Sequence, residues 1–576
     1  MAVALVGSGP ARDAVAAALE DVNAGVADVD PGGIANADLA VVVGQPGDVA
    51  FETANATALE HDVPWLAVEV GGLGGYPVVE AAVSGFGPGT GCYACLGQRV
   101  RANTDPEQDP QAAPDTETAR FAGAIAGREA ARLVSGKESG VVGGVIEIPH
   151  AEHRFLPVPG CECGQPRNRT LAIEHVDREL EESLTRAERG LDDRVGIVSE
   201  VGEAESFPVP YYLTQQADTS GFSDATAARQ AAGVDADWNA AFMKALGEGL
   251  ERYCAGVYRT GEFQTGTVDD VTEAVPPARF VTPDPDHESF DVADPGDDLD
   301  IEWVPGTDLA TGSEVSLPAE FVHFPPPTER FRPSITTGLG LGNGSVEALL
   351  SGLYEVIERD AAMLAWYSSF EPLGLDVNDD RFDTLVGRAR SENLRVDPLL
   401  LTQDVDVPVV AVAVHREAWP RFALGSSAHL DTATAATGAL AEALQNWLEL
   451  RGMGMEGAED VEGAIGQYAN FPENAQAFVD TDSAVPAKSV GPAEVPTGDA
   501  HLDAVVDRVT DEGLDVYAAR TTTPDVERLG FEGVRVLVPS AQPLFFDRPY
   551  FGDRATEVPA GMGFEPNHDR DHHPFP

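Results

Sequence analysis

The stretch GNGSVEALLSGLYEVIERDAAMLAW, Gly342 to Trp366, places charged residues in the middle of an apolar pattern. Its leucine, isoleucine and alanine side chains recur at three- and four-residue spacing, which predicts a buried α-helix. Glu355 and Glu358 are three positions apart and therefore share one face of that helix. This face either meets solvent or is directed into a binding site.

An E-x-x-E-R pattern occurs twice in the chain, each time inside an apolar helical segment. The first copy is in ALGEGLERYCA, which starts at Ala245, and the second is in LYEVIERDAAM, which starts at Leu353. The two copies supply these residues: Glu248, Glu251, Arg252, Glu355, Glu358 and Arg359. A third segment, GALAEALQNWLEL, keeps a weaker version in Glu442 and Gln445, and we expect its Glu449 to be an ordinary helix-surface acid. A helix face that only meets solvent would have no reason to carry the same motif twice, so the repetition favours a binding site.

Four carboxylates that are brought together need a counter-charge. Two unit charges about 4 Å apart repel by about 4 kcal/mol at an effective dielectric constant of about 20. Hard cations remove that repulsion, and oxygen ligands favour Mg²⁺, which commonly also holds phosphates. The spacing alone leaves a second interpretation open, in which two surface helices carry similar salt-bridge patterns. Ahead of the second helix, the glycine-rich SITTGLGLGNG (334–344) is a weak signal for a turn whose backbone N–H groups bind a nucleotide.

Four of the five cysteines form two close pairs. Cys92 and Cys95 make a C-x-x-C in GCYACLG, and Cys161 and Cys163 make a C-x-C in GCECG. Two thiol pairs flanked by glycine are typical of a tetrahedral zinc site, and because protein fills all four positions the site should be structural. Cys254 stands alone in an apolar helix and is expected to be a small core residue.

The first residues alternate strand and helix patterns. AVALVGSGPARDAVAAAL (2–19) predicts a strand, a glycine turn and a helix, and two further strands are predicted at DLAVVVG (38–44) and PWLAVEV (64–70). This alternation predicts a parallel α/β domain, which we place at residues 1–165. A polar, acidic linker is expected at 166–204, and a larger domain at 205–576.

The charge balance is strongly acidic, with 96 Asp and Glu against 37 Lys and Arg and a formal net charge of −59. Acid spread along a folded chain suggests a halophilic protein, because screening over ~3 Å at 1 M salt suppresses the self-repulsion. Nucleic acid and anionic membranes need a basic face and are not expected as partners. We find no apolar run of the ~20 residues that span a bilayer and no basic segment of a signal peptide, so we expect a cytoplasmic protein.

At these motifs the sequence resembles the YcaO superfamily from about residue 205 onward. The resemblance rests on ALGEGLERYCA, GLGLGNGSVEALLSGLYEVIERDA, GSSAHLDTATAATGALAEALQ and the final HHPFP. It implies a fold that uses ATP and Mg²⁺ to activate peptide backbone amides. The implied ATP and Mg²⁺ site consists of Glu248, Glu251, Asn343, Glu347, Glu355, Glu358 and Arg359. The resemblance also implies that Arg359 faces the ATP phosphates and that the carboxylate of Pro576 reaches the active site.

The first 190 residues resemble the E1-like, ThiF-related adaptor that accompanies such enzymes in azole-peptide (TOMM) biosynthesis. In that family the adaptor carries zinc and has lost its own adenylation chemistry. We therefore expect an α/β (α+β) protein: an E1-like domain with structural zinc, followed by a YcaO-type ATP-binding domain of mixed sheets and helices.

The resemblance implies an ATP-dependent cyclodehydratase. A Cys, Ser or Thr side chain of a peptide would attack the preceding carbonyl, ATP would phosphorylate the resulting oxyanion, and loss of phosphate would leave an azoline. Two alternatives stay open: a thioamide-forming enzyme that uses external sulfide, and a non-catalytic peptide-binding scaffold. Expected partners are a peptide or protein substrate, a second copy in a homodimer, and, where the reaction requires one, a leader-binding or sulfur-donating protein.

The chain departs from the family pattern at three places. A G-K-G that is frequent near the start of the domain is replaced by residues 232–235, AGVD. Lys244 stands where many members have Ser, four residues before the first Glu. The sequence starts at the E1-like strand, and we expect no winged-helix clamp for a leader peptide ahead of it.

Overall fold

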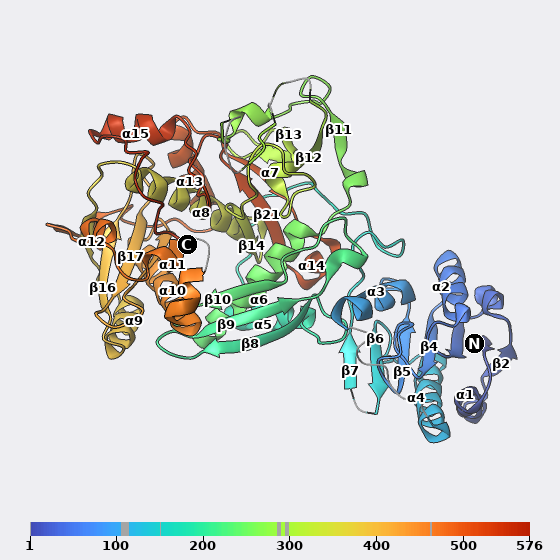
Figure 1. Cartoon of the computed structure of the whole chain (residues 1–576). Coiled ribbons are helices and arrows are strands. Elements are labelled where there is room, and N and C mark those ends of the chain that lie inside the picture. Colours follow the sequence, from blue (N-terminus) through green and yellow to red (C-terminus); the bar gives the residue numbers. More distant parts are fainter. Residues whose placement is uncertain are drawn as a thin grey trace.

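The computed structural model of the chain describes residues 2–104, 115–149, 151–284, 290–293, 296, 299–460 and 464–576. The N-terminal strands and helices gather at one end of the molecule, and the larger part of the chain forms the rest (Figure 1). Its combination of helices and several sheets confirms the predicted α/β class. Within the described ranges, no helix has both the length and the apolar composition needed to cross a membrane.

A seven-stranded sheet organises the N-terminal domain. Its order is β2-β1-β3-β4-β5-β6-β7, parallel from β2 to β4 and antiparallel from there to β7. The strands are β1 (Ala2–Val6), β2 (Gly25–Asp28), β3 (Leu39–Gly44), β4 (Trp65–Val70), β5 (Ala81–Phe86), β6 (Gly144–Ile148) and β7 (Ala151–Arg154). The three predicted strands are confirmed as β1, β3 and β4, whose continuous apolar runs are buried on both faces, as parallel strands require.

Helices cover both faces of this sheet. They are α1 (Pro10–Asp21), α2 (Val49–His61), α3 (Tyr93–Asn103) and α4 (Thr116–Val134). One apolar core lies under α1 and α4, and a second lies under α2 and α3. The second core continues into α6 (Trp238–Gly256) and α14 (Pro524–Leu529) of the larger part, so apolar packing joins the two domains.

Three sheets build the larger part. The first is antiparallel, with β8 (Val198–Glu205), β9 (Tyr211–Gln216) and β10 (Gln230–Val234). The second contains β11 (Gln264–Gly266), β12 (Ile301–Asp308), β13 (Glu314–Pro318), β14 (Leu339–Gly342), β20 (Tyr517–Arg520) and β21 (Glu532–Leu537). The third contains β15 (Leu373–Asp376), β16 (Arg395–Leu400), β17 (Val409–His415), β18 (Phe422–Ala428) and β19 (Ala484–Pro486).

Each sheet holds one of the three predicted helices against it: α6 on β10, α8 (Ser345–Trp366) on β14, and α10 (Thr432–Asp460) on β18. The remaining α-helices are α5 (Leu180–Ala187), α7 (Ala319–Val322), α9 (Asp380–Ser391), α11 (Ala464–Tyr468), α12 (Glu473–Val479), α13 (Asp499–Asp511) and α15 (Arg554–Met562). Short 3₁₀ turns occur at Pro31–Asn36, Glu188–Gly190, Thr219–Gly221, Thr260–Glu262, Pro277–Arg279 and Ala487–Ser489.

The three strand–helix units share one packing device, a glycine in the strand that touches the helix backbone. A Cβ on Gly233 would lie 2.1 Å from the backbone nitrogen of Ala245, and one on Gly340 would lie 2.1 Å from the carbonyl oxygen of Ala348. Gly425 makes the same approach to α10. Any side chain here would push the helix away, so the three helices are held in equivalent positions on their strands. Glu248 and Glu355 consequently occupy equivalent places on α6 and α8.

Candidate functional site

A cavity of about 660 Å³ opens between α6, the start of α8, and α10. Its polar lining includes Glu248, Glu251, Asn343, Glu347, Glu442 and Gln445. Four of these are predicted site residues, and the last two come from the weaker third copy of the motif. The structure therefore brings the three related helices to one cavity.

Helix α6 contributes two carboxylates, of which one is stabilised more than the other. Glu248 accepts hydrogen bonds from Arg252 and from the backbone N–H of Ala232, each at 3.0 Å. Glu251 is largely buried, and burial together with the nearby Glu248 and Glu355 raises its pKa to about 8, although Arg252 opposes the shift. The positive charge around Glu251 is thus too small to keep its carboxyl ionised in the metal-free site.

Asn343 and Glu347 are joined by two hydrogen bonds at the N-terminus of α8. The backbone N–H and the side-chain amide of Asn343 donate to one oxygen of Glu347, at 2.8 and 2.9 Å. Glu347 lies in the first turn of α8, where the helix dipole favours a carboxylate. The side-chain oxygen of Asn343 accepts from Arg178 at 2.9 Å and from Ser183 at 2.8 Å.

The other three predicted residues, all on α8, are not in the part of the cavity wall that the structure describes. Glu355 accepts from the backbone N–H of Gly338 at 3.1 Å. Glu358 accepts from the hydroxyl of Ser426, a cavity-lining residue, at 2.6 Å. Arg359 lies 3.4 Å from Glu358 and donates to the backbone oxygen of Pro576 at 3.0 Å. Arg359 therefore contacts the last residue of this sequence.

Glu442 lines the cavity and also approaches Arg359 of α8. It accepts from the backbone N–H of Ser426 at 2.6 Å and lies 3.9 Å from Arg359. Burial raises its pKa to about 7, with Arg359 opposing and Glu358 adding to the shift. Burial also raises the pKa of Glu358, against the effects of Arg359 and Ser426. Glu251 and Glu442, with pKa values of about 8 and 7, retain protons near neutral pH, which fits a site that gains a hard divalent cation.

The C-terminal residues are packed into the molecule. Phe575 and His573 are buried, and His573 bonds to the carbonyl of Phe545 at 2.7 Å. Trp366, the last residue of α8, donates from its indole N–H to the carbonyl of Asp571 at 2.8 Å. These contacts hold Pro576 against Arg359.

The cavity is also lined by polar residues that were not among the predicted site residues, among them Arg178, Ser183 and Lys244. Arg178 and Ser183 belong to the predicted linker, and a polar, acidic segment gives no sequence signal that it will reach a helix more than 150 residues away. Lys244 was noted in the sequence only as a departure from the family pattern, although it shares a helix face with Glu248 and Glu251. It forms an ion pair with Asp235 at 2.8 Å, so two of the positions that depart from the family pattern contact each other.

The four paired cysteines converge where the start of α3 meets the segment that follows β7. The sulfur atoms of Cys92 and Cys161 are 3.6 Å apart, those of Cys95 and Cys163 are 3.3 Å apart, and those of Cys92 and Cys95 are 3.9 Å apart. A tetrahedral ion with Zn–S bonds of about 2.3 Å separates its sulfurs by about 3.8 Å, so this donor set fits zinc. The backbone N–H of Val158 donates to Cys95 at 3.3 Å, as expected for a thiolate.

The glutamates are less tightly clustered than these thiols. Within the described residues, the groups of three or more His, Cys, Asp or Glu ligand atoms that all lie within 4.8 Å of one another are the four cysteines and a set of His153, Asp192 and Asp193. The predicted magnesium ligands do not form such a group, which agrees with the mutual repulsion of their charges.

Relatives of known sequence share part of this chain. An uncharacterized protein of Methanothermobacter thermautotrophicus is 30% identical over 226 residues, and an uncharacterized protein in the tfuA 3′ region of Rhizobium leguminosarum bv. trifolii is 30% identical over 165 residues. These matches cover 37% and 26% of this chain. They span only 56% and 39% of the relatives' own lengths.

Solved structures share the fold over more of the chain. A heterocyclase in complex with substrate and cofactor has a TM-score of 0.75 at 21% identity, over 98% of this chain and 83% of its own. The heterocyclase TruD has a TM-score of 0.69 at 21% identity, over 98% and 82%. YcaO from Methanopyrus kandleri, bound with AMPPCP and Mg²⁺, has a TM-score of 0.51 at 24% identity, over 65% and 94%. The first two likenesses extend through the N-terminal domain.

The family model described as YcaO cyclodehydratase, ATP- and Mg²⁺-binding, matches residues 232–542, more than half of the chain. This segment contains both E-x-x-E-R helices and the third helix. The resemblance to the YcaO superfamily is thereby confirmed, and the chain belongs to the YcaO family.

Proposed function

We propose that this protein uses ATP and Mg²⁺ to phosphorylate peptide backbone amides and so converts Cys, Ser or Thr residues of a peptide into azolines. The single observation that carries this proposal is the arrangement of the cavity. Glu248 and Glu251 face Asn343 and Glu347 across it, while Glu442 connects it to Arg359 and the buried C-terminal tail. Its volume of about 660 Å³ is in the range of small-molecule sites.

The nucleotide would occupy the cavity, with Mg²⁺ held by Glu248, Glu251, Glu355 and Glu358. Bound Mg²⁺ supplies positive charge to the ATP phosphates and to the carboxylates around it. Glu251 and Glu442, with pKa values of about 8 and 7, would release their protons when that charge arrives. Asn343 and Glu347 would line the part of the cavity that holds the ATP phosphates, and Arg359 would stabilise the negative charge of those phosphates.

The reaction needs positioning more than covalent participation by the enzyme. The substrate thiol or hydroxyl attacks the preceding carbonyl carbon, and its proton passes to a base. The resulting oxyanion attacks the γ-phosphorus of ATP, and ADP leaves. The amide nitrogen then loses its proton as phosphate departs, which forms the C=N bond of the azoline. The sum is peptide plus ATP giving azoline peptide, ADP and phosphate.

The tail would serve as the base or would orient it. The oxygen of Pro576 is held by Arg359, whose positive charge also lies near Glu358 and Glu442. An oxygen atom fixed in this way can accept the proton of the attacking group without first having to be ordered.

The test is to incubate the purified protein with Mg-ATP and short peptides that contain Cys, Ser or Thr, at several salt concentrations up to molar. We expect peptide-stimulated release of ADP and phosphate, together with loss of one water mass per azoline formed. A peptide in which sulfur replaces oxygen when sulfide is supplied would identify the thioamide reaction instead. Peptide binding without any binding of Mg-nucleotide would identify a scaffold.

We also propose that Cys92, Cys95, Cys161 and Cys163 hold one structural zinc ion. Helix α3 carries the first pair and also Arg99, which is fully buried and donates to Asp525 of the larger domain. Loss of the ion should therefore loosen the junction between the domains. Metal analysis should find about one zinc per chain, and Cys161→Ser should release it and lower the melting temperature, whereas Cys254→Ser should retain it. Metal-free protein of unchanged stability would contradict this proposal.

The peptide substrate is the partner that this function requires. The domain boundaries at residues 165 and 205, the homodimer and the cytoplasmic location stay predictions, and light scattering at several protein concentrations tests the dimer.

A further inference from the structure

The segment from residue 167 to residue 183, here called the strap, carries the chain from the cysteine cluster across the larger domain to the cavity. Its first anchor is Arg167, which donates to the carbonyls of Val257 at 2.7 Å and Cys254 at 3.0 Å at the end of α6, and to Thr522 at 3.0 Å. A guanidinium at the carboxyl end of a helix satisfies free carbonyls and opposes the helix dipole.

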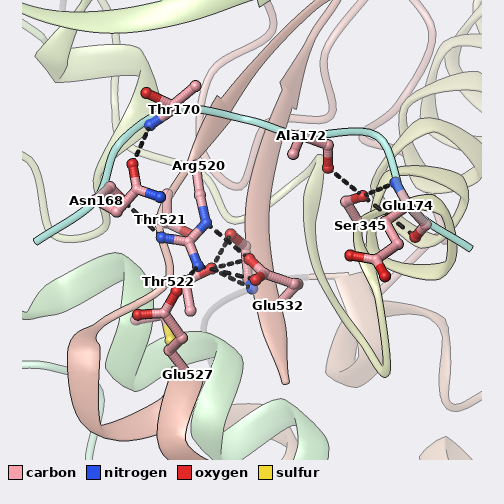
Figure 2. A network of polar contacts seen from close by, with 12 residues as sticks. Asn168, Thr170, Ala172, Glu174, Ser345, Arg520, Thr521, Thr522, Glu527 and Glu532 are labelled. Carbon is pink, nitrogen blue, oxygen red and sulfur yellow. Dashed lines mark hydrogen bonds and ion pairs between the residues drawn. The ribbon is translucent and has the colours of Figure 1, made fainter. Parts of the chain in front are cut away.

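The second anchor holds the strap to the sheet that contains β20 and β21. The carbonyl of Asn168 accepts from Arg520, which is itself held by Glu532 through two contacts of 2.8 Å and by Glu527 at 2.9 Å (Figure 2). Arg520 is only 4% exposed. A buried, bidentate arginine is a rigid support, so this part of the strap has one defined position.

The third anchor places the strap on the first residue of α8. The hydroxyl of Ser345 donates to the carbonyl of Ala172 at 2.6 Å, and the backbone N–H of Glu174 donates to the same hydroxyl oxygen at 2.7 Å (Figure 2). A Cβ on Gly344 would lie 2.7 Å from the carbonyl oxygen of Glu174 and 2.8 Å from a methyl of Val176. The strap therefore lies directly against the turn that presents Asn343.

Beyond this anchor, Arg178 reaches the wall of the cavity. Its Nη1 donates to Asn343 Oδ1 and to the carbonyl of Gly530, each at 2.9 Å, and Ser183 donates to Asn343 Oδ1 at 2.8 Å. Two donors on one oxygen define which way the carboxamide points, because a flipped amide would place its own N–H groups against them. The nitrogen of Asn343 is consequently directed to Glu347.

We propose that the strap is a working part of the nucleotide site, and that Arg178 and Ser183 are positioning residues for Asn343 and Glu347. This inference rests on the proposed function, since it assigns a role in the binding of Mg-nucleotide. Nucleotide affinity is then linked to docking of the strap, and therefore to the N-terminal domain from which the strap comes. Linkage is reciprocal, so bound nucleotide should also hold the strap in place.

The experiment measures calorimetric affinity for Mg-AMPPCP at one fixed salt concentration, in the parent protein, Arg178→Ala and Arg186→Ala. Arg186 is the matched control, because it follows the strap in α5, is partly exposed, and bonds to Glu182 rather than to Asn343. We expect Arg178→Ala to weaken binding on the order of 10-fold, the effect of losing a charge-assisted hydrogen bond, and Arg186→Ala to bind as the parent does. Melting temperatures without nucleotide separate this effect from general loss of folding.

Two further variants test the mechanism. If Arg178 acts through Asn343, the Arg178→Ala/Asn343→Ala double variant should bind no more weakly than Asn343→Ala alone. Gly344→Ala should displace the strap without changing Arg178 and should also weaken binding. Hydrogen exchange of residues 170–183 should slow when Mg-AMPPCP binds to the parent protein.

The possible outcomes distinguish the two proposals. A parent protein that binds no Mg-AMPPCP overturns the proposed function together with this inference. A parent that binds, with Arg178→Ala binding equally well or with losses that add independently in the double variant, overturns the role of the strap alone.

Discussion

Helices α6 and α8 carry the same E-x-x-E-R motif on equivalent strand–helix units, yet the structure gives the two copies different surroundings. On α6, Glu248 and Glu251 line the cavity. On α8, Glu358 is turned toward Ser426, and Arg359 holds the C-terminal tail. The motif determines which face of a helix is charged, whereas the neighbouring elements decide what that face meets.

The two arginines show the same difference. Arg252 pairs with Glu248 of its own helix at 3.0 Å, so this ion pair stays within the α6 copy of the motif. Arg359 contacts Pro576 and approaches Glu442 of α10, so it joins three distant parts of the chain. We therefore expect the α6 copy to serve nucleotide binding alone and the α8 copy to serve both binding and turnover.

The largest effect is expected from neutralising one carboxylate in each copy. Glu251→Gln and Glu358→Gln should each weaken Mg-nucleotide binding by at least about 100-fold, since even outer contacts of a metal site are worth about 10–100-fold. Folding should be retained, because glutamine replaces a carboxyl whose charged form burial already disfavours. Calorimetry with Mg-AMPPCP measures the effect. An unchanged affinity in Glu358→Gln alone would show that the α8 copy takes no part in metal binding.

The next effect separates turnover from binding at the α8 copy. Removing Pro576 while keeping the buried Phe575 should lower azoline formation on the order of 100-fold, the effect of misplacing a catalytic group by about 1 Å. Nucleotide affinity should change little, because Arg359 and the glutamates stay in place. Separate measurements of affinity and turnover make the test, and equal losses in both would contradict it.

A smaller effect concerns stability and pH. The pKa of Glu251 is raised from its ordinary 4.5 to about 8, so the folded protein binds more protons than the unfolded chain between these values. Stability of the metal-free protein should therefore fall as pH rises from about 4.5 toward about 8. Melting temperatures across this range should show a shallower fall in Glu251→Gln than in the parent and in Glu248→Gln. An identical slope in all three proteins would refute the assignment.

The smallest effect is expected at Glu449, which lies six residues after Ala443, the α10 residue that Gly425 approaches, just as Glu251 lies six residues after Ala245, which Gly233 approaches. We expected an ordinary surface acid there, but the residue is half-buried and accepts from Tyr211 at 2.9 Å and Gln445 at 3.0 Å. A glutamine can still accept both hydrogen bonds through its oxygen. Glu449→Gln should thus change nucleotide affinity by less than about two-fold, as near-neutral substitutions do. A loss comparable with that of Glu251→Gln would make α10 a third full copy.

Much of the fold and part of the site could be predicted before the structure was known. Strands β1, β3 and β4 and the three related helices follow from local apolar periodicity, and their motifs indicated the family that the comparison confirms. The order of the strands in the three sheets could not be predicted in this way, because antiparallel pairing depends on contacts between distant segments. Strand β14, for example, pairs with β21, almost 200 residues later.

The sequence by itself determined which residues share a helix face and which cysteines can act as pairs, because both properties depend on spacing along the backbone. Only the tertiary structure decided that Glu251 lines the cavity while Glu358 bonds to Ser426, that Arg178 holds Asn343 from 165 residues away, and that Pro576 reaches Arg359 across 217 residues. The physical reason is that the direction in which a charged face points is set by the sheets and chain ends packed around it. No local pattern records those long-range neighbours.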